Sequence, residues 1–199
     1  MKIITIILLG IIFLAGCDNS PDEIVNASVI NSQITDLEIS ENDLLPLPKR
    51  SALWMDSLFT MSSEIDGTVG GRMILEKYYI SEDGDSISIK ADLTIPEGAY
   101  QGVITITMTV DDHVAFVHFY PEMVFEKELK FSQSFKGLNL ENYESGKIDF
   151  CYLAPDGTIE LIKKDGVEIK IKDGQVKVSK AKLPHFSRYG WIRKGDGGG

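Results

Sequence analysis

The sequence predicts an all-β protein, an antiparallel β-sandwich preceded by a short N-terminal helix. The first observation is a series of about ten short runs of β-branched and aromatic residues, bounded by Gly, Asp and Pro, between residues 72 and 192. The second is alternation: Ile87, Ile89, Ala91 and Leu93 are separated by polar residues, as in a strand with one buried face. No helical pattern separates these runs, and this favours a sandwich.

Two-residue turn signals are the third observation. They are Asp156-Gly157, Asp165-Gly166 and Asp173-Gly174, and they predict that the late strands form an antiparallel meander. The predicted strands are 72–80, 86–95, 103–110, 114–119, 128–134, 147–153, 159–163, 167–172, 175–180 and 186–192.

The N-terminus has the features of a secretory signal peptide. Lys2 supplies one positive charge, and the apolar run from Ile3 to Phe13 follows it. This run is too short for a transmembrane helix, which needs roughly 20 apolar residues. Residues 1–16 are therefore predicted to be a signal peptide that is removed.

The next feature, Leu14-Ala15-Gly16-Cys17, resembles the lipobox of bacterial lipoproteins. The resemblance implies diacylglycerol on the Cys17 sulfur, cleavage before Cys17, and acylation of the new amino terminus. More than one acyl chain makes membrane anchoring stable. The protein is expected in the cell envelope, outside the cytoplasm and bound to the bilayer through Cys17. An ordinary secretory signal with an incidental cysteine is the alternative.

Asp18 follows this cysteine, and in enterobacteria an aspartate there resembles an inner-membrane retention signal. The rule does not extend to all phyla, so the inner and outer membranes both stay open. Residues 17–50 are acidic and are predicted to be a tether. The formal net charge of -10 argues against a nucleic-acid partner.

Residues 51–64 are predicted to form a short helix packed on or near the domain. Leu53, Trp54, Leu58 and Met61 have helical spacing, and docking to a partner is the alternative use of this apolar face. The glycine-rich end, residues 193–199, is predicted to be a flexible tail.

Four landmarks between residues 65 and 192 together resemble one family, the ZU-five-type domain of zonula occludens, netrin-receptor and ankyrin proteins and its bacterial surface relatives. The landmarks are Ile65-Asp66-Gly67-Thr68-Val69-Gly70-Gly71, Leu93-Thr94-Ile95-Pro96-Glu97-Gly98-Ala99, Phe119-Tyr120-Pro121-Glu122-Met123-Val124-Phe125 and Leu183-Pro184-His185-Phe186-Ser187-Arg188-Tyr189. The resemblance implies a β-sandwich. Tyr120 and Met123 depart from its pattern, because they replace two loop glycines.

His185-Phe186-Ser187 is the one constellation with potential catalytic chemistry. Some animal relatives of the domain cleave their own backbone at such a triplet. By resemblance, Ser187 would attack the Phe186 carbonyl while His185 takes the proton, which requires a strained bond and an aligned hydroxyl. The alternative is structural: Phe186 fills the core, His185 and Ser187 face outward or satisfy the last turn, and Arg188 pairs with a surface acid.

The remaining reactive groups have structural interpretations. Cys151, the only other cysteine besides Cys17, is expected to be a buried thiol rather than a reactive one. His113 and His118 would point to opposite faces of any strand they share, so no metal is expected there. Glu82-Asp83-Gly84-Asp85 lacks the spacing of a calcium-binding loop and is predicted to be a solvated turn.

The function expected from the sequence is that of a non-catalytic binding or scaffold module in the envelope, without a cofactor and with an envelope protein as its partner. Self-cleavage between Phe186 and Ser187 is the first alternative. Glycan binding is the second, and it would need an exposed aromatic platform. The aromatic residues considered for this platform are Trp54, Tyr78, Tyr79 and Trp191.

Overall fold

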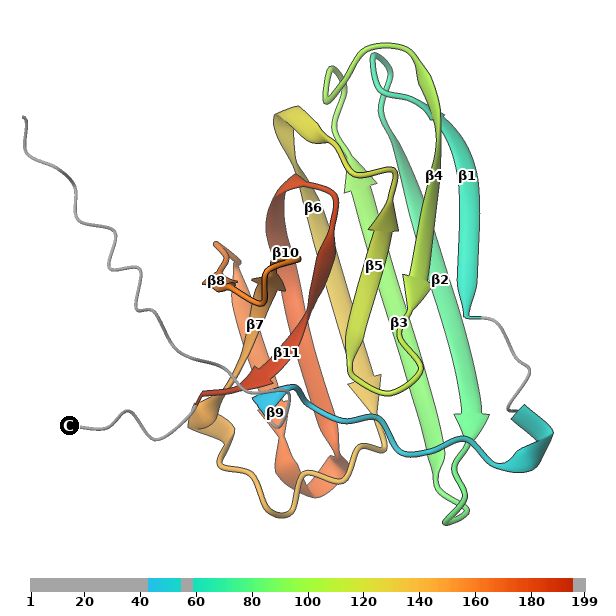
Figure 1. Cartoon of the computed structure of the whole chain (residues 1–199), viewed down its shortest axis with the longest axis vertical. Coiled ribbons are helices and arrows are strands. Elements are labelled where there is room, and N and C mark those ends of the chain that lie inside the picture. The colour runs from blue at the N-terminus through green and yellow to red at the C-terminus, as the bar shows by residue number, and fades with distance from the viewer. Residues whose placement is uncertain (1–42, 55–58, 195–199) are drawn as a thin grey trace, which may run out of the picture. The chain divides into compact units, whose positions relative to one another are not determined.

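The computed structural model describes residues 43–54 and 59–194, which form an all-β domain (Figure 1). Within these ranges there is no α-helix, and short 3₁₀-helices occur at Ala52–Trp54, Ser145–Lys147 and Ile171–Asp173. A helix long and apolar enough to cross a membrane is not found in this part of the chain. The predicted signal peptide, Cys17 and the predicted tether up to residue 42 lie outside the described residues.

The strands form two antiparallel sheets. The six-stranded sheet has the order β1 (Thr60–Asp66), β4 (Val103–Val110), β5 (Phe116–Tyr120), β11 (Arg188–Arg193), β7 (Ile148–Leu153) and β8 (Ile159–Leu161). The five-stranded sheet has the order β2 (Gly71–Ile80), β3 (Ser86–Ile95), β6 (Val124–Lys136), β10 (Gln175–His185) and β9 (Gly166–Lys170). The predicted all-β class is confirmed.

One hydrophobic core is shared by both sheets. The rings of Phe119 on β5 and Phe131 on β6 meet edge to face, with their centroids 5.2 Å apart. The indole N–H of Trp191 on β11 donates a 3.0 Å hydrogen bond to Gln133 on β6. Since each pair joins opposite sheets, the sheets pack face to face in a sandwich-like arrangement.

The alternation of apolar and polar residues predicted the positions of most strands correctly. The bounds of β3 and β4 are those predicted, and the alternate residues Ile87, Ile89, Ala91 and Leu93 of β3 are buried. In β4, Ile106 and Met108 are buried while the threonines between them face away from the core. This leaves a row of hydroxyl groups on the outer face of the six-stranded sheet.

The predicted late meander is only partly correct. Asp156-Gly157 connects β7 to its neighbour β8, and Asp173-Gly174 connects β9 to its neighbour β10. Asp165-Gly166, however, leads from β8 to β9, which lie in different sheets. A turn signal sets a local reversal of the chain, whereas long-range packing decides which sheet the next strand joins.

Residues 43–50, here called the strap, were predicted to be tether but belong to the domain. Leu45 and Leu47 are buried in the core. The Leu45 N–H donates to the Trp191 carbonyl, and the Leu45 carbonyl accepts from the Ala115 N–H, at 2.9 and 2.8 Å. The strap runs along the lower end of the domain in Figure 1 toward Ser81, which pairs with Arg50. Two buried leucines in an otherwise acidic segment were the missed signal.

The predicted helix over residues 51–64 is wrong at its C-terminal end, because Thr60–Asp66 is strand β1. Residues 55–58 lie outside the described residues, and Ala52–Trp54 is a 3₁₀-helix. In β1, the inward residues Met61, Ser63 and Ile65 pair with the inward face of β4. The small polar Ser63 interrupts this apolar alternation, so the two-residue period was not evident from the sequence.

The other end of the domain also extends beyond its predicted limit. Arg193 is the last residue of β11, and the Lys194 Nζ lies 2.7 Å from an Asp149 carboxylate oxygen. Residues 193 and 194 therefore belong to the fold. Residues 195–199 of the predicted tail lie outside the described residues.

Candidate functional site

The His185-Phe186-Ser187 triplet connects the two sheets. His185 ends β10, Arg188 begins β11, and the two residues between them make the connection. The Phe186 ring is 2% exposed and stacks on Phe119 with a centroid separation of 5.1 Å. It also meets Phe125 edge to face at 4.7 Å. The prediction that Phe186 fills the core is therefore confirmed.

His185 is oriented by aromatic neighbours. The Tyr189 hydroxyl donates to the His185 carbonyl at 2.8 Å and lies 3.3 Å from its ring Nδ1. The His185 ring also meets Tyr152 edge to face at 4.5 Å. Burial raises the pKa of Tyr189, so its hydroxyl stays protonated and acts as a donor.

Ser187 is buried, contrary to an outward-facing role, and its carbonyl accepts from the Phe119 N–H at 2.9 Å. Among the described residues, no hydrogen bond joins the Ser187 hydroxyl to His185 or His118. The contacts of the triplet are thus those of packing and of a connection between sheets.

A pocket of about 460 Å³ with a mixed polar and apolar lining lies beside this connection, on the outer face of the six-stranded sheet. We call it the Arg188 pocket. It is lined by Thr107, Thr109, His118, Phe119, Tyr120, Glu122, Pro155, Ser187 and Arg188. The pocket forms because β4, β5 and β11 are neighbours, with Thr109 opposite His118 and His118 opposite Arg188.

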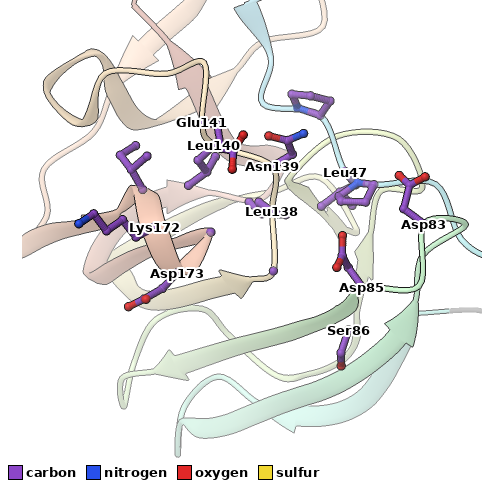
Figure 2. A pocket seen from close by; sticks show the side chains of 15 residues that line it. Leu47, Asp83, Asp85, Ser86, Leu138, Asn139, Leu140, Glu141, Lys172 and Asp173 are labelled. Carbon is purple, nitrogen blue, oxygen red and sulfur yellow. The ribbon is translucent and has the colours of Figure 1, made fainter.

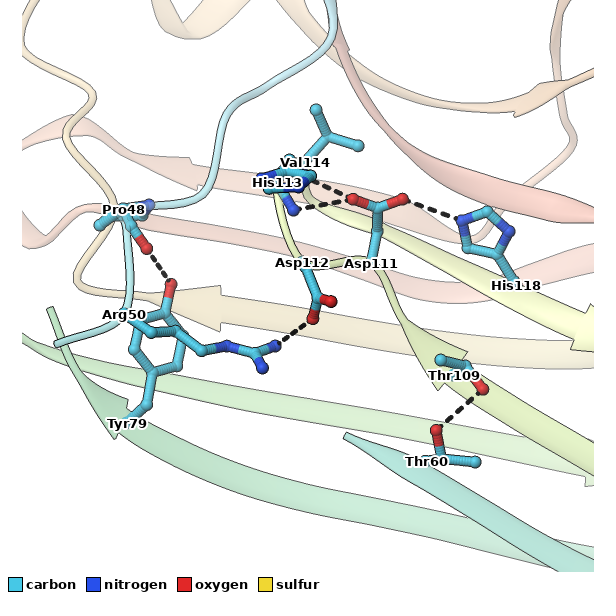
Figure 3. Close-up of polar contacts among 10 residues, drawn as sticks. All are labelled: Pro48, Arg50, Thr60, Tyr79, Thr109, Asp111, Asp112, His113, Val114 and His118. Atoms are coloured by element: carbon cyan, nitrogen blue, oxygen red, sulfur yellow. Dashed lines mark hydrogen bonds and ion pairs between the residues drawn. The ribbon is translucent and has the colours of Figure 1, made fainter. Parts of the chain in front are cut away.

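The side chains of Thr107 and Thr109 line one side of the Arg188 pocket, and each hydroxyl is paired with one on β1. The Thr109 hydroxyl lies 3.0 Å from that of Thr60, as Figure 3 shows, and the Thr107 hydroxyl lies 2.8 Å from that of Ser62. Each pair joins β1 to β4 across the strands and so holds the hydroxyls in place. Tyr120, which is opposite Thr107, is 69% exposed.

His118 is held by Asp111, as Figure 3 shows. The His118 Nε2 lies 3.1 Å from one Asp111 carboxylate oxygen, and the other oxygen accepts from the backbone N–H of His113 and Val114. Burial by itself raises the pKa of Asp111, but these hydrogen bonds outweigh it and lower the pKa to about 2. His113 contributes only its backbone here, and no cluster suited to a metal ion occurs within the described ranges.

The Asp111 contacts predict a specific dependence of stability on pH. A carboxyl with a depressed folded-state pKa stabilises the fold fully above its unfolded pKa of about 4, and this stabilisation is lost as the pH falls toward 2. Asp111→Asn keeps the oxygen that accepts from His113 and Val114 and removes the charge. We expect the variant to be less stable by about 2 kcal/mol at pH 7, with the difference shrinking between pH 4 and pH 2.

Denaturant unfolding at a series of pH values measures this difference. Asp111→Ala, which also removes the turn hydrogen bonds, should lose further stability by an amount that does not change with pH. A constant difference between wild type and Asp111→Asn from pH 7 to pH 2 would contradict the assignment.

Arg188 differs from the other arginines of the chain, which are Arg50, Arg72 and Arg193. Each of those three forms an ion pair with an aspartate. Arg188 has no such acid within the part of the chain that the structure describes, so its predicted surface ion pair is not found. Its Nε is buried without a hydrogen-bond partner there, and its guanidinium carbon lies 5.9 Å from the Phe116 ring centroid.

No known family model, curated protein or solved structure matches this chain. The resemblance to the ZU-five-type domain therefore stays a prediction from the four sequence landmarks.

A larger groove lies at the strap end of the domain (Figure 2). Its side chains include the acids Asp83, Asp85, Glu141 and Asp173, with Lys172 as the one basic residue. Figure 2 shows these acids at separate places around leucines of the strap and of the segment after β6. An acidic rim with no convergent set of donors is typical of a solvated surface, so the Arg188 pocket is the better candidate.

The remaining predicted site residues are mostly structural. Cys151 is buried, and burial raises the pKa of its thiol, so the thiol is unreactive as expected. Tyr79 and Trp191 are buried, whereas Tyr78 is 60% exposed on β2. The Trp54 side chain lies outside the described residues. The aromatic platform considered from the sequence is therefore not formed by Tyr79 or Trp191.

Proposed function

We propose that this protein is a lipid-anchored, extracytoplasmic β-sandwich that binds another component of the cell envelope through the Arg188 pocket and has no catalytic role. The anchor rests on the sequence Leu14-Ala15-Gly16-Cys17. The binding role rests on one observation above all: a pocket that contains an arginine without an acidic partner among the described residues.

Charge supports this choice of surface. The chain has a formal net charge of -10, and its other three arginines all pair with acids. Arg188 lines the pocket, and an arginine without an acidic partner keeps guanidinium donors that a ligand can use. The neighbouring hydroxyls are held on strands rather than on loops, which favours a preformed binding surface.

Site-specific photo-crosslinking in intact cells tests the proposal. A photoreactive residue at position 120 is placed in the pocket, and the matched control is the same residue at position 78. Both positions carry exposed tyrosines, but they lie on different sheets. We expect a discrete crosslinked product from position 120 and none from position 78. Equal labelling at the two positions, or none at either, would contradict binding at the pocket.

The anchor is tested in the same cells. Cys17→Ala should release the protein from membranes or leave it as the uncleaved precursor, because lipid on Cys17 is the anchor we propose. A variant that is processed at the same site and still sediments with membranes would show that the lipoprotein assignment is wrong.

Self-cleavage is the second candidate function, because the bond between Phe186 and Ser187 lies in the connection between the two sheets. Intact mass under denaturing conditions distinguishes it, since both fragments could stay bound in the folded domain. We expect one uncut species, because His185 contacts Tyr152 and Tyr189 rather than the Ser187 hydroxyl. Two fragment masses in the wild type, replaced by one uncut mass in Ser187→Ala, would establish self-cleavage.

A further inference from the structure

We infer that the Arg188 pocket binds a sugar residue that carries a carboxylate, an inference that rests on the proposed binding function and names its class of ligand. The pocket brings together a cation, the hydroxyl groups of Thr107 and Thr109, and an exposed aromatic ring. Each of these matches a different part of an acidic sugar.

Arg188 would receive the carboxylate. A guanidinium offers a planar fork of donors that matches the two oxygens of a carboxylate. Its cross-strand neighbours are His118 on one side and Leu153 on the other, and neither is an acid. The guanidinium is also packed near the Phe116 ring, which limits its orientations. Arg188 is therefore positioned before a ligand arrives.

The Thr107 and Thr109 hydroxyls, each paired with a hydroxyl on β1, would receive the hydroxyl groups of the sugar. In a pair such as Thr60 and Thr109, one hydroxyl donates to the other, so the accepting hydroxyl keeps its own hydrogen and both oxygens keep lone pairs. The pair of Ser62 and Thr107 offers the same combination. A surface with donors and acceptors at fixed positions suits a polyol. The exposed ring of Tyr120 adds an apolar surface for its carbon skeleton.

The acids near the pocket argue for a single negative charge on the ligand. Glu122 lines the same pocket, and Asp111 lies next to His118. A phosphate dianion or a polyanion would be repelled by these carboxylates, whereas a monocarboxylate can pair with Arg188 while its hydroxyls donate to Glu122. The volume of about 460 Å³ is within the range of small-ligand pockets.

Titration of the full lipidated chain with D-glucuronate tests the inference, in a detergent without a sugar head group. D-glucose lacks the carboxylate and acetate lacks the hydroxyls, so these two compounds separate the contributions. We expect D-glucuronate to bind at least about ten-fold more tightly than either, as for a site whose buried polar groups need a partner. Nuclear magnetic resonance or calorimetry measures the dissociation constants.

Arg188→Lys should weaken D-glucuronate binding by at least about ten-fold, because lysine lacks the planar fork. The matched control is Arg72→Lys, at an arginine of the other sheet that pairs with Asp92, and it should not change binding. Tyr120→Ala, at an exposed position, should also weaken binding without affecting the fold. Far-ultraviolet circular dichroism verifies that each variant is folded.

Two results would overturn the inference. D-glucuronate could fail to bind more tightly than glucose and acetate, or its binding could be the same in Arg188→Lys and Tyr120→Ala as in wild type. If the photoreactive residue at position 120 still gives its discrete product, only the ligand class is wrong. If that product is absent as well, the proposed function fails together with the inference.

Discussion

Phe186→Ala is expected to lower the free energy of unfolding by about 3–5 kcal/mol, the range for removal of a buried aromatic side chain. The Phe186 ring contacts Phe119 of the six-stranded sheet and Phe125 of the five-stranded sheet. Its removal therefore leaves a cavity between the sheets, where they are joined by only two residues. Neighbouring rings cannot easily fill this cavity, because each already packs against other aromatic side chains.

Ser187→Ala is the matched control, since it changes the adjacent residue of the same connection. The free energy of unfolding of this variant should fall by no more than about 0.5–1 kcal/mol. The Ser187 carbonyl, rather than its hydroxyl, accepts the hydrogen bond from Phe119, and the substitution keeps that carbonyl. Denaturant unfolding of both variants gives the comparison. Similar midpoints for the two variants would contradict the role of Phe186 in the core.

Gly190→Ala should destabilise the domain by about 3 kcal/mol, at the upper end of the cost of overpacking. A Cβ at position 190 would lie 2.3 Å from the Phe116 Cγ and 2.5 Å from the Ala115 carbonyl oxygen. Strand β11 is hydrogen-bonded to β5 on one side and to β7 on the other, so its backbone cannot shift to relieve these contacts without breaking strand pairing. The carbonyl contact cannot be relieved by a rotamer change, because it is made by backbone.

Gly166→Ala provides the control for this prediction. Gly166 is also a strand glycine, but an added Cβ there meets nothing within 4 Å, and β9 is an edge strand. We expect its effect to be within about 0.5 kcal/mol, the range for a surface substitution. Thermal or denaturant unfolding of the two variants separates them. If Gly190→Ala is as stable as Gly166→Ala, then Phe116 and Ala115 do not pack against Gly190 as closely as the structure shows.

The strands that the sequence predicted well are those whose alternation is complete. β3 and β4 have apolar residues at every second position, because one face of β3 is buried along its whole length and one face of β4 is buried from Ile106 to Val110. β1 was not predicted as a strand, because Ser63 lies on its inward face and interrupts the apolar alternation. β1 is also at the edge of the sheet. The strap was not predicted to belong to the domain, because Leu45 and Leu47 are bounded by prolines and follow an acidic segment. This composition is typical of a tether, although both leucines are buried.

The candidate site was harder to predict than the strands, because it depends on register. Thr109, His118 and Arg188 come from three strands that are far apart in the sequence, and only the pairing of β4, β5 and β11 brings them together. The alternate threonines of residues 103–110 were a visible signal of an outer polar face. The missing acid beside Arg188 had no such signal, because the sequence predicted a surface ion pair for that residue.

The strap also determines how a mechanical load on the N-terminal side of the domain would be carried. Tension applied at Asp43 acts first on its ion pair with Arg193 and on the hydrogen bonds of Leu45 to Trp191 and Ala115. These contacts can open in sequence while the strands stay paired. The eight residues of the strap span at most roughly 25–29 Å when extended. Up to that length of chain can be drawn out before the force reaches residue 51, while the sheets stay intact.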